Sequence, residues 1–313
     1  MCMEHVPGEA LAHNRKAWAS GVGAVPDDRL PGPWGAEVAT VVAHERGGPD
    51  WFTLRMAAPC IAASARPGQF AQVGVTPLPA TGRGTHTYDP LLRRPLSFCT
   101  IDRGRGVLSL VYRVVGRGTA ILAQAVPGQR LELLGPLGRP FPCLAPRPAH
   151  AASAANRDGA LILVGGGLGI PPMAAAAAWA LAAGRKAVAI LGARTSSYLA
   201  GADAVAATGA DVRYATEDGS RGHRGLITPL LAVALDAHPA AEVWACGPSG
   251  MLASVQRLCH ARAVNAWLCV ERPMACGFGV CLGCAIARAD GAGFLKACVD
   301  GPVFRGDEID VQG

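Results

Sequence analysis

The chain has 313 residues, of which 50% are hydrophobic, and a formal net charge of +6. This length suits about two domains of roughly 150 residues each, and the apolar content lets each domain bury a core. The basic residues are scattered, as in Arg93 and Arg94, and no basic stripe alternates with aromatic side chains. Nucleic acid is therefore excluded as an expected partner.

Compartment and membrane topology are also constrained by the sequence. The first residues lack the charged-then-apolar order of a secretory signal, and the 11 cysteines are an odd number, so we expect a reducing, cytoplasmic location. The uncharged stretch from Ala160 to Ala183 is long enough to span a bilayer. It contains Gly165–Gly167 and Pro171–Pro172, which would break a spanning helix, so no membrane span is expected.

The first half of the chain predicts a small antiparallel β-barrel. Residues 1–33 are rich in Gly, Pro, Asp and Arg without periodicity, and we expect a poorly ordered extension there. The barrel domain is assigned to residues 34–150, where Gly and Pro separate short β-like runs. These runs are Glu37–Val42, Trp51–Met56, Gln69–Val75, Val107–Val115 and Arg130–Leu134. Pro77–Asp89 is predicted to be an inserted loop, and Cys143–Asp158 a linker.

From Ala160 onward the sequence predicts a different order of elements. The apolar run Leu161–Val164 is followed by a glycine turn and a helix to Ala183, after which strands and helices alternate. Alternation of this kind predicts a doubly wound parallel α/β sheet, assigned to residues 158–264. The later elements are expected at Ala187–Leu191, Ala202–Thr208, Asp211–Ala215, Leu226–Ala237, Glu242–Ala245 and a helix from about Ser249. Residues 265–313 are predicted to form a small third, cluster-binding unit.

Four cysteines in this last unit carry the most chemical information. Cys276, Cys281, Cys284 and Cys298 have the C-x4-C-x2-C…C spacing of a plant-type [2Fe–2S] site. Glycines between them allow a loop to wrap closely around an inorganic core. The alternatives are a zinc knuckle or buried thiols, but zinc sites usually pair their cysteines as two short C-x2-C clips. The spacing therefore favours an iron–sulfur cluster and an electron-transfer function.

Two further motifs follow predicted strands of the α/β domain. Gly165, Gly166, Gly167 and Gly169 form a turn that opens a helix, which can present backbone N–H groups to a pyrophosphate. The alternative is a tight turn with no ligand. The second motif, C-G-P-S-G-M, follows the last predicted strand, at the sheet edge where ligands bind in open α/β sheets. Its first three residues, Cys246, Gly247 and Pro248, are candidates to line a nucleotide site, whereas the alternative for Cys246 is a buried structural thiol.

Two segments of the barrel region are weaker candidates. Arg94, Pro95, Leu96 and Ser97 offer a planar guanidinium for a phosphate or ring carbonyl and a nearby hydroxyl. Gly116, Gly118 and Thr119 lie downstream and offer donors for a second phosphate. On composition alone, both segments are ordinary strand ends.

In chain order, the motifs R-R-P-L-S, G-x-G-T, G-G-G-L-G-I-P-P, C-G-P-S-G-M and M-A-C-G-F-G-V-C-L-G-C form a recognisable series. This series resembles the ferredoxin reductase superfamily and, more narrowly, the iron–sulfur electron-transfer subunits of NAD-dependent dihydroorotate dehydrogenases. The resemblance extends from about Ala36 to Asp310. The cysteine block and the D-G-P-V-F ending at Phe304 are its most specific parts.

The resemblance implies an FAD-binding barrel, a nicotinamide domain and a [2Fe–2S] domain. It places Arg94 and Ser97 against the flavin, Gly118 and Thr119 at the FAD diphosphate, and the glycine turn with the C-G-P segment around NAD(H). The four cysteines match the cluster ligands position by position. No catalytic acid/base pair is expected in this chain.

The resemblance also implies a partner, an FMN-bearing catalytic subunit that oxidises dihydroorotate in pyrimidine biosynthesis, assembled as a heterotetramer. The main alternative is a related subunit serving another acceptor, of the sulfide dehydrogenase, ferredoxin–NADP reductase, hydrogenase or sulfite reductase type. A different class of alternative is a zinc-stabilised scaffold that binds a nucleotide as a regulator. The sequence does not decide whether the chain uses NADH or NADPH. Arg194 could bind the 2′-phosphate of NADPH, or it could be a solvated loop residue.

Overall fold

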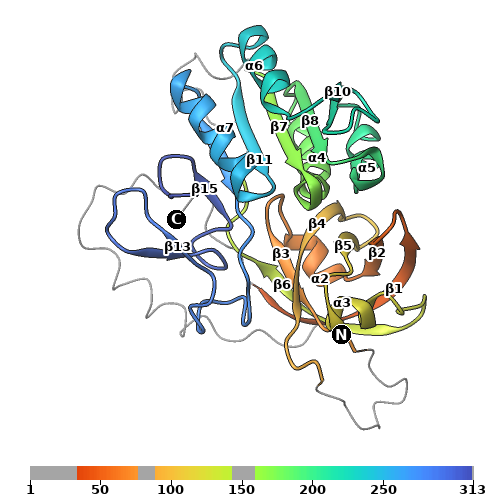
Figure 1. The fold of residues 1–313 in the computed structure, drawn as a ribbon. Coiled ribbons are helices and arrows are strands. Elements are labelled where there is room, and N and C mark those ends of the chain that lie inside the picture. The colour runs from red at the N-terminus through yellow and green to blue at the C-terminus, as the bar shows by residue number, and fades with distance from the viewer. Residues whose placement is uncertain (1–33, 77–88, 143–158, 312–313) are drawn as a thin grey trace.

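The computed structural model describes residues 34–76, 89–142 and 159–311 (Figure 1). The predicted extension at 1–33, most of the predicted loop Pro77–Asp89 and the predicted linker Cys143–Asp158 lie outside these residues. The described chain forms a β-barrel and, above it in Figure 1, an α/β sheet from which the C-terminal segment extends.

The N-terminal half is a closed antiparallel barrel with the strand order β1-β2-β5-β4-β3-β6. The strands are β1 (Gly35–Arg46), β2 (Trp51–Ala57), β3 (Phe70–Val73), β4 (Arg94–Asp102), β5 (Val107–Arg113) and β6 (Arg130–Leu137). Two short helices, α2 (Pro59–Ser64) and α3 (Arg117–Leu122), complete it. The predicted barrel is confirmed. Residues Arg94–Asp102 form β4, a strand that is not among the runs predicted from the sequence.

The second half contains a seven-stranded sheet with the order β10-β9-β8-β7-β11-β12-β15. The strands are β7 (Leu161–Gly166), β8 (Ala187–Ala193), β9 (Asp211–Thr216), β10 (His223–Arg224), β11 (Glu242–Cys246), β12 (Ala266–Cys269) and β15 (Val303–Arg305). All neighbours pair in parallel except β12 and β15, which are antiparallel. The helices are α4 (Pro171–Ala182), α5 (Ala202–Ala206), α6 (Thr228–Ala237) and α7 (Ser249–Ala261).

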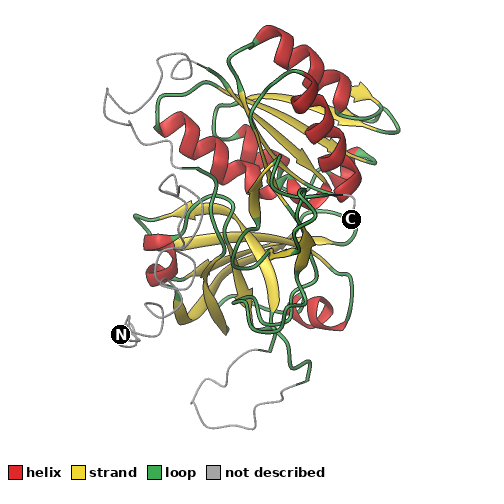
Figure 2. Cartoon of the chain, turned by 90° about the vertical axis from the view of Figure 1, so that its left-hand side faces the viewer, coloured by secondary structure: helices red, strands yellow, loops and turns green. Residues whose placement is uncertain are grey.

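Helices cover both faces of this sheet, which explains why β7 is a continuous apolar run. Leu161 and Leu163 pack in a core with α4 and α5. Ile162 and Val164 point to the opposite face and pack in a core with α6 and α7. Figure 2 shows the helices on both sides of the sheet. The predicted doubly wound arrangement is confirmed.

The C-terminal segment is tied into the sheet at both ends. Trp267, Leu268 and Cys269 of β12 pair with β15, and the chain between these strands carries the four predicted cluster ligands. Within this segment β13 (Ala285–Ala287) and β14 (Phe294–Lys296) form a small hairpin. The division into separate domains at residues 264 and 265 stays a prediction, but the sheet hydrogen bonds continue across it.

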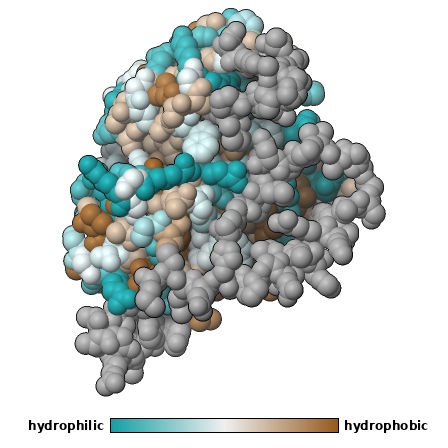
Figure 3. All heavy atoms as spheres, turned by 180° about the vertical axis from the view of Figure 1, so that it is seen from behind, coloured by the Kyte–Doolittle hydropathy of each residue, from teal (hydrophilic) through white to brown (hydrophobic). Residues whose placement is uncertain are grey.

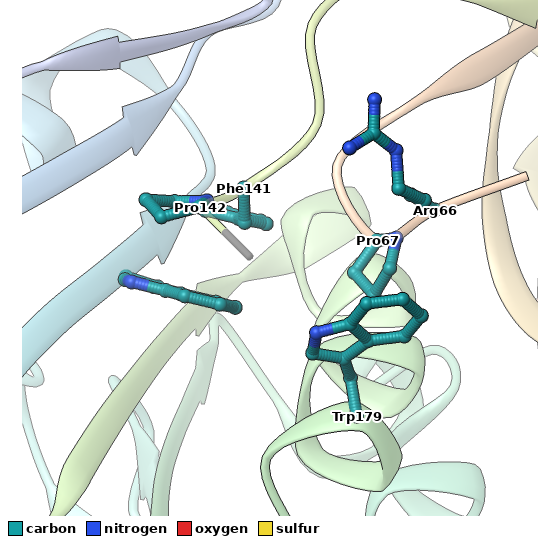
Figure 4. A pocket seen from close by; sticks show the side chains of 6 residues that line it. Arg66, Pro67, Phe141, Pro142 and Trp179 are labelled. Carbon is teal, nitrogen blue, oxygen red and sulfur yellow. The ribbon is translucent and has the colours of Figure 1, made fainter. Parts of the chain in front are cut away.

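A small hollow lies where the barrel meets the sheet (Figure 4). It contains about 150 Å³ of space not filled by protein atoms, below the usual range for a ligand pocket. Phe141 and Trp244 stack beside it, with ring centroids 4.5 Å apart and planes only 2° apart. We therefore interpret this place as packing between the two halves. The hollow is lined by Arg66, Pro67, Phe141, Pro142, Trp179 and Trp244.

Among the helices of the described residues, none combines the length and the apolar character needed to cross a bilayer. On the face seen from behind, hydrophilic and hydrophobic residues are interspersed (Figure 3).

The anchoring of the C-terminal segment gives a first prediction. Phe304 of β15 is buried against the sheet, so Phe304→Ala should lower the free energy of unfolding by about 3–5 kcal/mol through lost burial and a cavity. Phe294→Ala is the control, since this side chain in the same segment is 75% exposed. Urea unfolding followed by tryptophan fluorescence measures both. Equal stability of the two variants would contradict the anchoring role.

Candidate functional site

The four predicted cluster ligands form two close pairs, Cys276 with Cys281 and Cys284 with Cys298. The sulfur of Cys276 accepts a hydrogen bond from the backbone N–H of Cys281 at 3.5 Å, and the sulfurs of Cys284 and Cys298 are 3.2 Å apart. Four thiolates on two irons give two sulfurs to each iron, so two pairs suit a binuclear cluster. The C-x4-C-x2-C…C spacing, rather than these two contacts, favours [2Fe–2S] over a zinc knuckle.

The loop that carries the first three candidate ligands depends on left-handed backbone conformations. Gly277 and Gly279 have φ angles of +82° and +91°, and Leu282 has +60°. A β-carbon at Gly279 would also lie 2.7 Å from a side-chain carbon of Val299. Glycine therefore suits both positions, as the tight wrap predicts, whereas Gly283 has no positive φ and a β-carbon there would meet only the sulfur of Cys281, at 3.6 Å.

The protein environment prepares the pairs differently for metal binding. Desolvation acts to raise the pKa of Cys276, but backbone N–H groups of Cys281 and Phe278 outweigh it and lower the pKa to about 6. This thiol is therefore largely a thiolate, the form that binds metals, at neutral pH. Burial, followed by the neighbouring Cys284 thiol, raises the pKa of Cys298. A metal must displace the proton of Cys298 on binding.

The two candidate segments of the barrel are brought into contact. Arg94 begins β4, and its guanidinium lies over Gly118, where an added β-carbon would be 2.3 Å from Nη2. The hydroxyl of Thr119 accepts hydrogen bonds from the backbone N–H groups of Val115 and Gly116, at 3.0 and 3.3 Å, and so shapes the turn before α3. This convergence is consistent with a shared anion site.

The remaining barrel candidates lie on β4 beside β3. Pro95 pairs with Gln72, Leu96 with Ala71, and Ser97 with Phe70. Side chains of paired residues lie on the same face of a sheet. Leu96 packs against the barrel core, so Pro95 and Ser97 belong to the outer face.

The glycine turn and the C-G-P segment also meet. Gly165 pairs with Cys246 across β7 and β11, and a β-carbon on Gly169 would lie 2.0 Å from the backbone oxygen of Cys246. A β-carbon on Gly166 would lie 2.4 Å from the sulfur of Met251. Gly167 faces open space with a φ of +55°. The turn leads into α4, with proline in its first positions, and leaves backbone N–H groups at the carboxyl edge of the sheet.

Gly247 and Pro248 follow β11 directly. Gly247 has a φ of +156°. A β-carbon at Gly169 would lie 2.5 Å from the backbone nitrogen of Gly247, so the two segments can come this close only because residue 169 is glycine. Pro248 precedes α7, and its carbonyl accepts from the backbone N–H of Leu252. These residues lie at the carboxyl end of β11, against the glycine turn.

Cys246 is a protected thiol. It is 2% exposed and is paired across the strands with Cys269. A side-chain hydrogen bond with Cys269, followed by burial, raises the pKa of Cys246 well above its ordinary value. The thiol is therefore neutral at physiological pH and cannot act as a thiolate nucleophile.

Two residues at the junction were not identified as functional from the sequence. Cys269 was left unassigned, yet its sulfur lies 4.0 Å from the backbone oxygen of Gly68 in the barrel. Gln72 of β3 is buried, and its Nε2 atom lies 3.5 Å from the backbone oxygen of Ala275, beside the cluster loop. The signal for Gln72 was a polar residue within an otherwise apolar strand.

Comparison with known proteins agrees with this geometry. Residues 271–310 match the family model of the iron–sulfur cluster binding domain of dihydroorotate dehydrogenase B. The chain is 36% identical over 278 residues to the "Dihydroorotate dehydrogenase B (NAD(+)), electron transfer subunit" of Geobacillus kaustophilus, covering 88% of this chain and 98% of that protein. The subunit of the same name from Enterococcus faecalis is 32% identical, with 87% and 97% covered.

Solved structures support the fold. An NADH-dependent reduced ferredoxin–NADP oxidoreductase, described for flavin-based electron bifurcation, is 29% identical with a TM-score of 0.70 and covers 89% of this chain and 91% of its own. The ferredoxin reductase of carbazole 1,9a-dioxygenase is 22% identical with a TM-score of 0.54, covering 74% and 67%, and shows the shared fold.

The contact between the glycine turn and β11 gives a second prediction. Gly169→Ala should weaken NADH binding by tenfold or more, because its β-carbon would meet the backbone of Cys246 and Gly247, which cannot move aside cheaply. Gly104→Ala is the control, since its β-carbon meets only Asp102 at 3.6 Å. Titration of NADH followed by fluorescence measures both variants. Unchanged affinity in Gly169→Ala would contradict the predicted site.

Proposed function

The chain belongs to the family of electron transfer subunits of dihydroorotate dehydrogenase B, and we propose that it passes electrons between a catalytic dihydroorotate dehydrogenase subunit and NAD. The observation that carries this proposal is the arrangement of Cys276, Cys281, Cys284 and Cys298 as two thiol pairs in the matched segment. In the biosynthetic direction, electrons run from dihydroorotate to NAD.

The expected cofactors differ in how many electrons they transfer at a time. When bound, a flavin exchanges electron pairs with a nicotinamide and single electrons with an iron–sulfur cluster, which carries one at a time. The protein's own part is to bind and orient these groups. The barrel at residues 34–150 is proposed to hold FAD, the sheet at 158–264 NAD(H), and residues 265–313 the cluster.

The proposed roles of individual residues follow from their placement. Arg94 and Ser97 would contact the flavin, Ser97 from the outer face of β4, and Gly118 with Thr119 would bind the FAD diphosphate beside Arg94. Pro95, Leu96 and Gly116 would shape these two segments. The neutral thiol of Cys246 would lie beside the nicotinamide without reacting with it. Gly165–Gly169, Gly247 and Pro248 would line the dinucleotide site.

The catalytic partner is proposed to carry FMN and to form a heterotetramer with this chain. Its docking place is the outer side of the cluster loop, where Val280 and Leu282 are 74% and 63% exposed. Exposed apolar side chains within one loop mark an interaction site. A partner seated here would lie next to the proposed cluster ligand Cys281, which stands between these two residues.

A cytoplasmic location is proposed because four thiols must stay available for iron. Eight of the described cysteines, among them the four candidate ligands, are free, which favours this location, whereas the disulfide at Cys60 is unusual for it.

A second candidate function is electron transfer to a different acceptor. The reduced ferredoxin–NADP oxidoreductase structure is 29% identical to this chain over most of both lengths. A subunit of that type would share all three cofactors and differ in its partner.

One experiment separates the two functions. The chain is purified together with its catalytic partner, and orotate-dependent oxidation of NADH is measured. Activity with orotate supports the dihydroorotate system. Oxidation of NADH with ferredoxin but not orotate would support the second candidate, and a colourless preparation would overturn both.

The paired thiols give a third prediction. Cys281→Ala should abolish the visible absorption and electron paramagnetic resonance signal of the cluster while leaving FAD content largely intact, because one iron loses half of its protein ligands. Cys259→Ala is the control, since this buried cysteine lies on α7, away from the cluster loop. Retention of the cluster signal in Cys281→Ala would count against the ligand assignment.

The docking loop gives a fourth prediction. Val280→Asp should weaken assembly with the catalytic subunit at least tenfold, because a carboxylate would be desolvated at the interface. Val233→Asp is the control, because it is 59% exposed on α6, a helix of the α/β sheet. Analytical ultracentrifugation measures assembly, and absorption spectra check that both variants keep their cofactors. Equal assembly of the two variants would exclude this docking place.

A further inference from the structure

Gln72 connects the barrel with the cluster loop. It lies on β3, where its neighbours Ala71 and Val73 belong to the barrel core and Phe70 packs in the core that includes Cys284 and Cys298. Strand side chains alternate between faces, so Gln72 and Phe70 point out of the barrel toward the C-terminal segment. Gln72 is nevertheless fully buried, because the cluster loop covers it.

The amide group of Gln72 faces the loop backbone. Nε2 lies 3.5 Å from the carbonyl oxygen of Ala275, the residue before ligand Cys276. A β-carbon at Gly277 would lie 2.6 Å from the same nitrogen, so the loop passes directly over the amide. The opposite amide orientation would set two carbonyl oxygens against each other, so the donor side belongs to the loop.

The amide oxygen of Gln72 lacks a hydrogen-bond donor within the part of the chain that the structure describes. Oε1 of Gln72 is buried without a hydrogen-bond partner among the described residues. Leaving such an acceptor unpaired costs about 1–3 kcal/mol, so it points to a donor that arrives from outside the chain. By contrast Gln69, just before β3, is satisfied at both ends: Oε1 accepts from the Arg66 amide at 2.9 Å, and Nε2 donates to Gly138 at 2.8 Å.

The position of Gln72 indicates what kind of ligand could donate a hydrogen bond to its Oε1 atom. It pairs with Pro95, which has no N–H to offer, and the next pair on the same face is Phe70 with Ser97. Pro95 and Ser97 belong to the proposed flavin segment. A ring bound against them would come within the neighbourhood of Oε1, and an isoalloxazine carries N–H donors.

We propose that Gln72 is a positioning residue that couples the flavin site to the cluster loop. Its amide nitrogen holds the Ala275 carbonyl beside Cys276, and its oxygen accepts a hydrogen bond from an N–H of the isoalloxazine ring. This inference rests on the proposed function, because it requires both FAD and the cluster. It assigns to one side chain a direct contact with both redox sites.

The test is Gln72→Leu, which keeps the size of the side chain and removes its hydrogen bonds. We expect about tenfold weaker binding of FAD to flavin-depleted protein, measured by flavin fluorescence, since one buried hydrogen bond is lost. We also expect an altered visible circular dichroism spectrum of the cluster, because the loop loses its support. The thermal midpoint of the flavin-depleted protein should stay level or rise, since an unpaired buried acceptor has been removed.

The matched control is Gln69→Leu, which should lower the thermal midpoint and leave the affinity for FAD unchanged. If Gln72→Leu does not fold, Gln72→Met provides the same measurement with a flexible side chain. Wild-type affinity for FAD together with an unchanged cluster spectrum in the variant would overturn the inference. Failure of the wild-type chain to bind FAD or a cluster would instead overturn the proposed function.

Discussion

The arrangement of the site depends on the backbone pairing of three strands, β11, β12 and β15. Cys246 pairs with Cys269, and Cys269 pairs with Val303. The chain that holds the cluster ligands leaves the sheet after β12 and returns to it at β15. Sheet hydrogen bonds therefore fix both ends of the segment that carries the cysteine pairs relative to the nucleotide turn. A redox relay needs such fixed separations, because its rate depends on where each cofactor is held.

The barrel is held against the same segment by buried contacts. Phe70 packs in a core with Cys284 and Cys298, and the backbone amide of Arg139 donates to the carbonyl of Gly301. On the opposite side of the junction, Phe141 of the barrel half stacks on Trp244 of the sheet. The barrel is thus packed against both the cluster segment and the nucleotide sheet. This explains how a chain with three binding functions keeps its sites in one rigid arrangement.

Environment gives the cysteines different chemistry. In the cluster loop, backbone donors lower the pKa of Cys276 to about 6 and favour the thiolate that binds metal. In the sheet, a neighbouring thiol and burial raise the pKa of Cys246 and keep it neutral. A neutral thiol at the proposed nicotinamide site would provide a small, polarizable surface without competing as a nucleophile. Side-chain type alone does not distinguish these two roles.

The sequence by itself determined the architecture and the metal chemistry. Periodicity separated the barrel from the α/β sheet, and cysteine spacing indicated a binuclear cluster, because both signals are local and repeat along the chain. Only the tertiary structure decided which distant segments meet. It placed Arg94 over Gly118, joined β12 and β15 to the sheet, and buried Gln72 beneath the cluster loop. These contacts depend on strand register and on close packing between elements far apart in the sequence, which no local pattern encodes.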